Sequence, residues 1–216
     1  DPKTNSTLVD YNRAGTPLIE IVTEPDIATP EEAKIFLQEL QRVMRTLGVS
    51  DADMEKGQMR CDANISLRKE GETTLNSKTE IKNINSFKYV EKALAYEIAR
   101  QQQLWEEGTI PSHATRGWNS EAGITEEQRT KEDAADYRYF PEPDIPPFQF
   151  TQEELDAIKE NLPELPVEAR KRFSNEYGTS DEHANLLIAN PMLADMFENV
   201  SSEISQMMGS VLILWK

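Results

Sequence analysis

Apolar and polar residues alternate strictly from Met59 to Leu67, and this alternation constrains the fold more than any other feature of the chain. Successive side chains of a β-strand point to opposite faces of a sheet, so the segment is predicted to be a half-buried strand. Its apolar side carries Met59, Cys61, Ala63, Ile65 and Leu67. Its polar side carries Arg60, Asp62, Asn64 and Ser66. The carboxylate of Asp62 is therefore expected on a polar sheet face.

Two further short segments are predicted strands that carry one acidic residue each. Glu20 interrupts the apolar run Leu18–Val22, and because burying an unpaired carboxylate is costly, it needs a partner, a cation or water. In Lys78–Ile84 a period of two places Glu80 between two lysines on one face. Carboxylates beside positive charges indicate a metal and phosphate site, since Mg²⁺ takes few carboxylates together with substrate phosphates. The alternative, a solvated sheet face with cross-strand ion pairs, stays open.

Four basic side chains are candidate partners for phosphate oxygens, because lysine and arginine form charge-assisted hydrogen bonds with them. They are Arg60, Lys78, Lys82 and Arg138. The sequence contains neither of the two familiar glycine-rich phosphate loops, so those two classes of nucleotide site are excluded. The two histidines, His113 and His183, have no cysteine or histidine at metal-ligand spacing, which argues against a zinc site.

Helix signals surround the predicted strands. A capping box at Thr29 predicts a helix that ends near Leu47, and a second helix is expected between Ser86 and Gly108. Residues 109–136 lose this periodicity and are predicted to be a long loop or an irregular hairpin.

The character of the sequence changes near residue 150, beyond which only helix signals occur. Thr151 opens a further capping box, Pro166–Tyr177 is a predicted helix that ends at Gly178, and helical stretches flank Asn190. The order of elements predicts an α+β domain in residues 1–150 followed by an all-helical region in residues 151–216.

Composition restricts the function further. The formal net charge of −16 argues against sequence-independent binding to nucleic acid, which requires clustered lysine and arginine. No apolar run reaches membrane-spanning length and the first residues lack signal-peptide features, so no membrane association is expected. The single cysteine, Cys61, cannot form an internal disulfide, which fits a reducing cytoplasm.

Four motifs in register carry a family resemblance. They are DYNRAGTPLIEIVTEPD at 10–26, RCDANIS at 60–66, EIKNINSF at 80–87 and DYRYFPEPD at 136–144. In this order and spacing they closely resemble the B-subunit family of aspartyl/glutamyl-tRNA amidotransferases. The resemblance covers residues 8 to about 200.

The resemblance implies a tRNA-dependent amidation in translation that uses ATP and Mg²⁺. The family phosphorylates the side-chain carboxylate of Glu-tRNA(Gln) or Asp-tRNA(Asn), and ammonia then displaces the phosphate. An A subunit supplies this ammonia from glutamine, and a small C subunit joins the two in a heterotrimer. The implied fold is a cradle-like catalytic domain similar to glutamine synthetase, followed by the start of a helical domain. A bacterial cytoplasm is implied, or alternatively an organelle.

The resemblance also implies roles for individual residues. The implied metal ligands are Glu20, Asp62 and Glu80. Arg60 and Lys82 would neutralise charge on the transferred phosphoryl group, and these two residues with Arg138 would contact ATP. Family members carry further site residues upstream and a tRNA-binding tail downstream, so the chain by itself is expected to be inactive.

A second hypothesis from another class is a non-catalytic assembly module that bridges the glutaminase subunit and tRNA. In that case the acidic strand faces are solvent or interface surface. The two hypotheses differ in whether Glu20, Asp62 and Glu80 converge on one cation.

Overall fold

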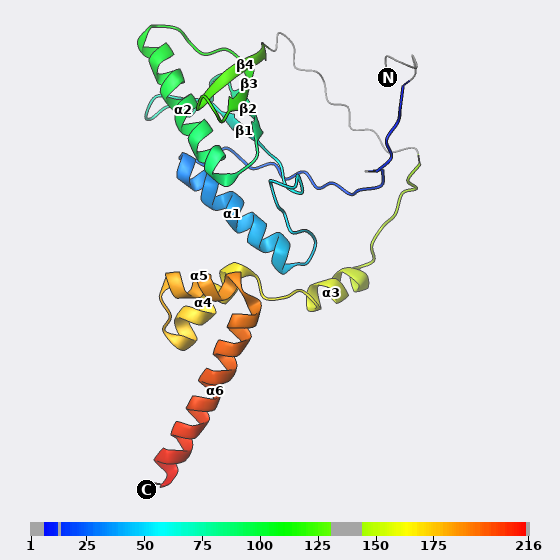
Figure 1. The fold of residues 1–216 in the computed structure, drawn as a ribbon, viewed down its shortest axis with the longest axis vertical. Helices are drawn as coiled ribbons and strands as arrows, with labels where there is room; N and C mark the ends of the chain where they lie inside the picture. Colours follow the sequence, from blue (N-terminus) through cyan, green and yellow to red (C-terminus); the bar gives the residue numbers. More distant parts are fainter. Residues whose placement is uncertain (1–6, 13, 131–143, 215–216) are drawn as a thin grey trace.

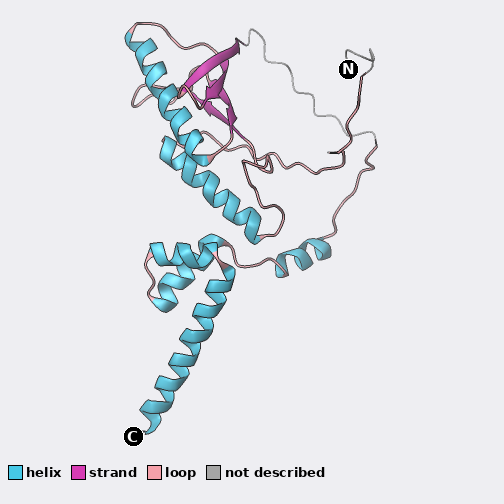
Figure 2. Cartoon of the chain, in the orientation of Figure 1, coloured by secondary structure: helices cyan, strands magenta, loops and turns pink. Residues whose placement is uncertain are grey.

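The computed structural model describes residues 7–12, 14–130 and 144–214, with side chains described up to residue 208 except at 129–130. The elements form a sheet with two long helices, followed by helices alone (Figures 1 and 2). In chain order they are α1 (Pro30–Thr46), β1 (Cys61–Ile65), β2 (Thr79–Ile84), α2 (Phe87–Glu106), β3 (Ala114–Asn119), β4 (Ile124–Thr130), α3 (Gln152–Glu160), α4 (Pro166–Tyr177), α5 (Asp181–Ala189) and α6 (Pro191–Leu214). The mixed α+β composition and the helices beyond residue 150 agree with the sequence prediction.

The sheet has the strand order β1-β2-β3-β4. β1 with β2 and β3 with β4 pair antiparallel, whereas the central pair β2 and β3 is parallel. Parallel neighbours require a crossover connection, and here the connection from β2 to β3 contains α2. The irregular-hairpin alternative for residues 109–136 is thus confirmed for the part that the structure describes, as the β3–β4 hairpin.

Helix α2 covers one face of the sheet, and α1 packs against α2 (Figure 1). The strand alternation predicted from the sequence is confirmed, because Ala63 and Ile81 are buried on the helix side whereas Asp62 and Asn64 are exposed. The buried apolar core consists of Leu37, Met54, Ala63, Ile81, Ile84, Val90, Ala93, Leu94 and Trp118. Among the described residues, no helix other than α2 packs extensively on the sheet, and we call the face opposite α2 the open face.

A buried carboxylate fixes α2 to the second hairpin. Glu97 on α2 is fully buried and accepts hydrogen bonds from Arg100 at 2.5 Å, from Gln101 at 3.0 Å and from the Thr125 hydroxyl at 2.9 Å. Arg116 on β3 adds an ion pair at 3.6 Å and also donates to the Thr125 hydroxyl at 2.8 Å. A buried charge is tolerated only when it is paired and hydrogen-bonded, and Glu97 meets both conditions.

The capping box of α1 is formed as the sequence predicts. The Thr29 hydroxyl accepts a hydrogen bond from the Glu32 amide at 3.1 Å, and the Glu32 carboxylate accepts one from the Thr29 amide at 3.0 Å. Thr29→Ala removes the first of these bonds, so we expect it to lower the free energy of unfolding by about 1 kcal/mol. Urea denaturation of the variant, compared with Thr29→Ser, measures this difference, and an unchanged midpoint for the alanine variant would contradict it.

The helices beyond residue 150 form a second, smaller core. Ala169 and Phe173 of α4 pack with Ala184 and Leu187 of α5. This helical part contacts α1 through an ion pair between Arg170 and Glu39, whose side-chain atoms are 3.1 Å apart.

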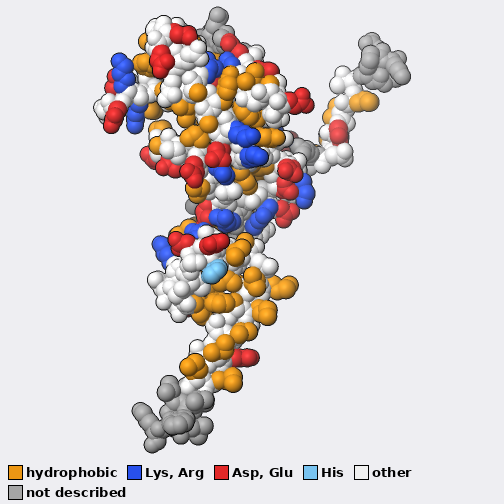
Figure 3. Space-filling view, turned by 60° about the vertical axis from the view of Figure 1, so that its left-hand side comes forward, with side chains coloured by type: hydrophobic (Ala, Val, Ile, Leu, Met, Phe, Trp, Pro, Cys, Tyr) orange, Lys and Arg blue, Asp and Glu red, His pale blue; other side chains and the backbone are white. Residues whose placement is uncertain are grey.

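In Figure 3 hydrophobic side chains lie along α6. No helix in the described part of the chain is both long and apolar enough to span a membrane.

The predicted strand Leu18–Val22 is wrong. The structure describes these residues as an exposed segment without regular structure. A strand exists only where a neighbour completes its hydrogen-bond ladder, and no described strand lies alongside this segment. The residue types of this segment are typical of a strand, but its large apolar side chains are mostly exposed, and Leu18 is 91% exposed.

Candidate active site on the open face of the sheet

The ammonium group of Lys82 lies between two carboxylates on the open face. Its Nζ is 2.7 Å from Asp62 Oδ2 on β1 and 3.2 Å from Glu80 Oε1 on β2. Glu80 and Lys82 share this face because they are two residues apart on one strand. The structure thus brings together two of the three acids that the sequence singled out, and places a predicted phosphate contact between them.

The other oxygen of Glu80 is held from the neighbouring strand. The Thr115 hydroxyl on β3 donates a hydrogen bond to Glu80 Oε2 at 3.1 Å. Glu80 and Thr115 stand side by side in the parallel register, and Thr115 is only 2% exposed. The carboxylate is therefore held at both oxygens, by Lys82 on one and by Thr115 on the other.

The environment keeps Lys82 charged. The hydrogen bond to Asp62 raises the pKa of Lys82, partial burial lowers it by less, and Glu80 raises it further. The neighbouring Cys61 stays neutral. Burial, with a smaller contribution from Asp62, raises the pKa of its thiol to about 11. A protonated thiol is neither a nucleophile nor a metal ligand, so Cys61 contributes packing rather than chemistry.

Two β-bulges shape the open face around Gly117. In the β1–β2 pair, the two residues Lys82 and Asn83 stand opposite the single Asp62. In the β3–β4 pair, Gln128 is the extra residue. A Cβ atom on Gly117 would lie 3.0 Å from Asn83 Nδ2 and even closer to Gln128 Nε2. Glycine is thus the residue that lets both carboxamides approach the sheet beside Lys82.

The remaining predicted site residues lie outside this group. Glu20 is exposed on the segment without regular structure, and Arg60, directly before β1, and Lys78, directly before β2, are also exposed. The hydrogen bonds and ion pairs within the described residues include none from the Arg60 guanidinium. Arg138 lies outside the described residues.

Asp62 and Glu80 are too few to hold Mg²⁺ alone, but they suit a Mg²⁺ ion that is also bound by substrate phosphates. Within residues 7–12, 14–130 and 144–214 no group of three or more acidic, histidine or cysteine side chains is gathered for a metal ion. Mg²⁺, however, commonly takes one or two carboxylates and completes its coordination with water and substrate phosphates. Asp62 and Glu80 on one face, with the cation Lys82 between them, provide that smaller set.

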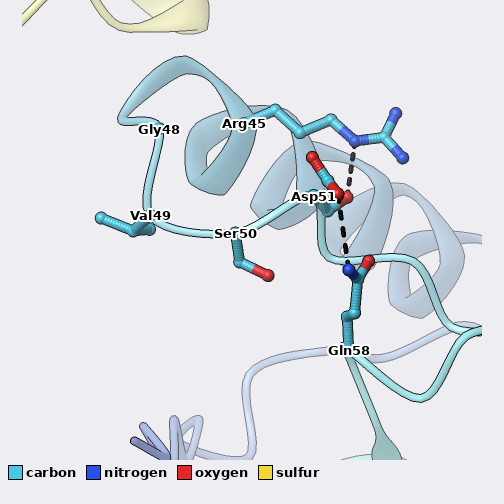
Figure 4. A pocket seen from close by; sticks show the side chains of 6 residues that line it. All are labelled: Arg45, Gly48, Val49, Ser50, Asp51 and Gln58. Atoms are coloured by element: carbon cyan, nitrogen blue, oxygen red, sulfur yellow. Dashed lines mark hydrogen bonds between the residues drawn. The ribbon is translucent and has the colours of Figure 1, made fainter. Parts of the chain in front are cut away.

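A separate shallow pocket lies where the chain leaves α1 (Figure 4). Its lining consists of Arg45, Gly48, Val49, Ser50, Asp51 and Gln58. Arg45 Nε donates to the Asp51 carbonyl at 2.7 Å, and Gln58 Nε2 donates to Asp51 Oδ2 at 3.4 Å. These bonds connect the end of α1 to the loop before β1, so the pocket is explained by local structure and contains none of the candidate site residues.

Comparison with known protein families shows the family to which the chain with this sheet belongs. The family described as the GatB/GatE catalytic domain matches residues 1–156, which include the four strands that the structure describes and helices α1 and α2. The chain belongs to the GatB/GatE catalytic-domain family. All residues of the Asp62–Lys82–Glu80 group lie within the matched range.

Curated relatives of this GatB-type chain are named as the B subunit of the aspartyl/glutamyl-tRNA(Asn/Gln) amidotransferase. The protein of Carboxydothermus hydrogenoformans is 49% identical over 199 residues, covering 92% of this chain and 41% of the relative. That of Thermoanaerobacter sp. X514 is 50% identical over 93% of the chain, and that of Dehalococcoides mccartyi strain 195 is 52% identical over 91%. The chain thus spans about two fifths of the length of these relatives.

Three residues of the site were missed by the sequence reasoning. Thr115 and Gly117 lie in a segment whose strand period is obscured by turn-forming residues, and Gln128 is polar without a distinctive pattern. A usable signal was Gly117 between Arg116 and Trp118, because a glycine inside a short strand indicates a bulge or the close approach of neighbouring groups.

Proposed function

We propose that this chain supplies the phosphorylating site of a tRNA-dependent amidotransferase. The substrate is the side-chain carboxylate of Glu-tRNA(Gln) or Asp-tRNA(Asn), and the phosphoryl donor is ATP. The observation that carries the proposal is the open face itself, where Lys82 bridges Asp62 and Glu80 within a chain of the GatB/GatE family. The names of the relatives support the choice of substrate.

The reaction explains why acids and a lysine lie together. An oxygen of the acceptor carboxylate attacks the γ-phosphorus of ATP, the bond to the bridging oxygen breaks, and ADP leaves. Ammonia then forms a bond to the acyl carbon, the acyl C–O bond breaks, phosphate leaves, and a proton is lost. Both reactants of the first step are anionic, so the site must neutralise charge where it develops.

The residues of the chain divide this work. Asp62 and Glu80 would hold Mg²⁺, which when bound gathers the phosphate oxygens and reduces their mutual repulsion. Lys82 remains protonated beside its two acids and donates to the transferred phosphoryl group. Arg60, exposed directly before β1, provides a second cation, and Arg138 contacts the nucleotide. Glu20, which lies outside the Asp62–Lys82–Glu80 group in the structure, stays in the proposal as a third metal ligand.

The proposal extends to the assembly. The chain acts with an A subunit that releases ammonia from glutamine and with a C subunit, in a heterotrimer of the bacterial cytoplasm. Residues 1–150 form part of a cradle-like, glutamine-synthetase-like catalytic domain, and residues 151–216 begin the helical domain. With a net charge of −16, binding of tRNA is assigned to other parts of the full-length protein.

Glu80→Gln in the full-length protein, reconstituted with its A and C subunits, tests this function. Because partners of metal ligands already contribute about tenfold or more in metal affinity, loss of a ligand charge should raise the Mg²⁺ concentration for half-maximal conversion of Glu-tRNA(Gln) by at least about tenfold. The measurement is glutamine- and ATP-dependent formation of Gln-tRNA(Gln) across a Mg²⁺ titration.

Glu121→Gln is the matched control. Glu121 lies at the turn between β3 and β4, where it is exposed. Its Mg²⁺ titration should coincide with that of the wild type. An unchanged titration for Glu80→Gln would favour the assembly-module hypothesis for this face.

A further inference from the structure

The two bulged positions around Gly117 carry the same chemical group. Asn83 is one of the two residues opposite Asp62 in the β1–β2 pair, Gln128 is the extra residue of the β3–β4 pair, and both end in a carboxamide. Bulges redirect a side chain out of the regular alternation and are frequent beside active sites. Here the two bulges direct the side chains of Asn83 and Gln128 toward the same place, the open face at Gly117.

The backbone is strained in this arrangement. Asn83 has φ of 63°, in the left-handed region that is unfavourable for residues with a side chain, although asparagine tolerates it better than most. Strained conformations persist where the surrounding structure holds them, and they gather at functional sites. A glycine would relieve the strain at this position but would remove the amide.

The approach of the amides depends on Gly117. A methyl group there would lie 3.0 Å from Asn83 Nδ2 and in collision with Gln128 Nε2. Both atoms are ends of flexible side chains, so Gly117→Ala would displace the amides rather than unfold the strand. Gly117 is itself buried and stands beside Lys82 in the parallel register.

The carboxamides of Asn83 and Gln128 can form further hydrogen bonds. Within the described residues, the side-chain hydrogen bonds include none to Asn83 or Gln128. Each amide nitrogen is a donor of two hydrogens, and both nitrogens face the space over Gly117. The ammonium of Lys82 lies on the same face, where Asp62 and Glu80 balance its charge. Glu126 stands opposite Gly117 on β4, and its carboxylate accepts a hydrogen bond from Asn119. Two converging amide donors with an ammonium beside them suit an anionic oxygen as their ligand.

We propose that Asn83 and Gln128, converging over Gly117 beside Lys82, form a subsite that binds an anionic oxygen of the substrates. The inference rests on the proposed function, because that function supplies two such oxygens. One is a phosphoryl oxygen of ATP, and the other is the acceptor carboxylate of the aminoacyl-tRNA. The subsite fixes one of these oxygens next to the charge network of Asp62, Lys82 and Glu80.

Charge substitution in the reconstituted full-length complex tests the subsite. Asn83→Asp and Gln128→Glu keep the size of each side chain but replace donors by a negative charge. Loss of a hydrogen bond to an anion should raise the KM of the substrate concerned by about tenfold or more. The KM for ATP and the KM for Glu-tRNA(Gln) are measured separately, and the larger increase identifies the source of the oxygen. Gly117→Ala should raise the same KM.

Asn119→Asp is the control, because it makes the same substitution as Asn83→Asp at the last residue of β3, next to the turn. Asn119 Oδ1 accepts turn hydrogen bonds from the amides of Glu121 and Ala122, and aspartate preserves this role. Aspartate loses the hydrogen bond from Asn119 Nδ2 to Glu126, which is exposed. Both KM values should then equal those of the wild type. If Asn83→Asp, Gln128→Glu and Gly117→Ala leave both KM values within twofold while Asp62→Ala abolishes amidation, the subsite is refuted and the proposed function stands. If Asp62→Ala is also without effect, the proposed function itself fails.

Discussion

Asp62→Ala in the full-length protein is expected to reduce tRNA-dependent amidation by at least about 100-fold, the scale seen when one group that stabilises transition-state charge is removed. The substitution removes the closer of the two carboxylates that hold Lys82, and with it a proposed oxygen ligand of Mg²⁺. Because Asp62 is about half exposed on the open face, the protein should remain folded. The measurement is conversion of Glu-tRNA(Gln) to Gln-tRNA(Gln) by the complex with A and C subunits.

Glutaminase activity measured in the same samples separates loss of phosphorylation from loss of assembly. It should persist in Asp62→Ala, since we assign ammonia release to the A subunit. Asp156→Ala serves as a control, because Asp156 is exposed on α3, where it accepts a hydrogen bond from Gln152 at 2.9 Å. Amidation that continues at the wild-type rate in Asp62→Ala would remove Asp62 from catalysis.

Glu97→Ala is expected to destabilise the protein by about 3–5 kcal/mol, the cost of breaking a buried ion pair by removal of one partner. The variant leaves Arg116, whose side chain is 13% exposed, without its buried ion-pair partner, and it removes the acceptor of the Thr125 hydroxyl. Both partners belong to the β3–β4 hairpin, so the loss should loosen the strand that presents Thr115 and Gly117. Chemical denaturation measures the effect.

Glu106→Ala on the same helix is the control for Glu97→Ala, because Glu106 is exposed. It should change the free energy of unfolding by no more than about 0.5 kcal/mol. A similar small change for Glu97→Ala would show that the buried network contributes little to holding α2 on the sheet.

The pH dependence of stability gives Glu97 a second signature. Burial raises its pKa, but hydrogen bonds from Arg100, Gln101 and Thr125, with the charge of Arg100, outweigh burial and lower the pKa below the ordinary glutamate value. A lowered pKa in the folded state stabilises the protein above the pKa of the unfolded state, and this contribution is lost as the pH falls through the folded pKa. Glu97→Gln should therefore lose less stability on acidification than the wild type does.

Local signals account for the parts of the fold that the sequence predicted. The alternation around Asp62, the capping boxes at Thr29 and Thr151 and the glycine at 178 each act within a few residues of the chain, and the structure confirms each of them. The strand predicted at Leu18–Val22 failed for the opposite reason. Its pattern is local, but its pairing partner is not, and no described strand completes its ladder.

The candidate site was predictable only in part. The period of two placed Glu80 and Lys82 on one face of a strand and Asp62 on the polar face of another. It could not show that these two faces coincide, or that β2 pairs with β1 on one side and with β3 on the other. That order brings Thr115 to Glu80 and Gly117 to Lys82. The bulges that redirect Asn83 and Gln128 arise from pairing registers, which a single sequence does not specify.

A crystal structure of the full-length protein with Mn²⁺ and a non-hydrolysable ATP analogue tests most directly whether the open face is the phosphorylating site. We expect one anomalous peak coordinated by Asp62 and Glu80 at distances near the ~2.1 Å typical of such small divalent ions, with a phosphate oxygen completing the site. Lys82 Nζ should then lie within about 3 Å of the terminal phosphoryl group. A nucleotide and metal bound elsewhere, with Lys82 still bridging the two carboxylates, would contradict the assignment of the open face as the phosphorylating site.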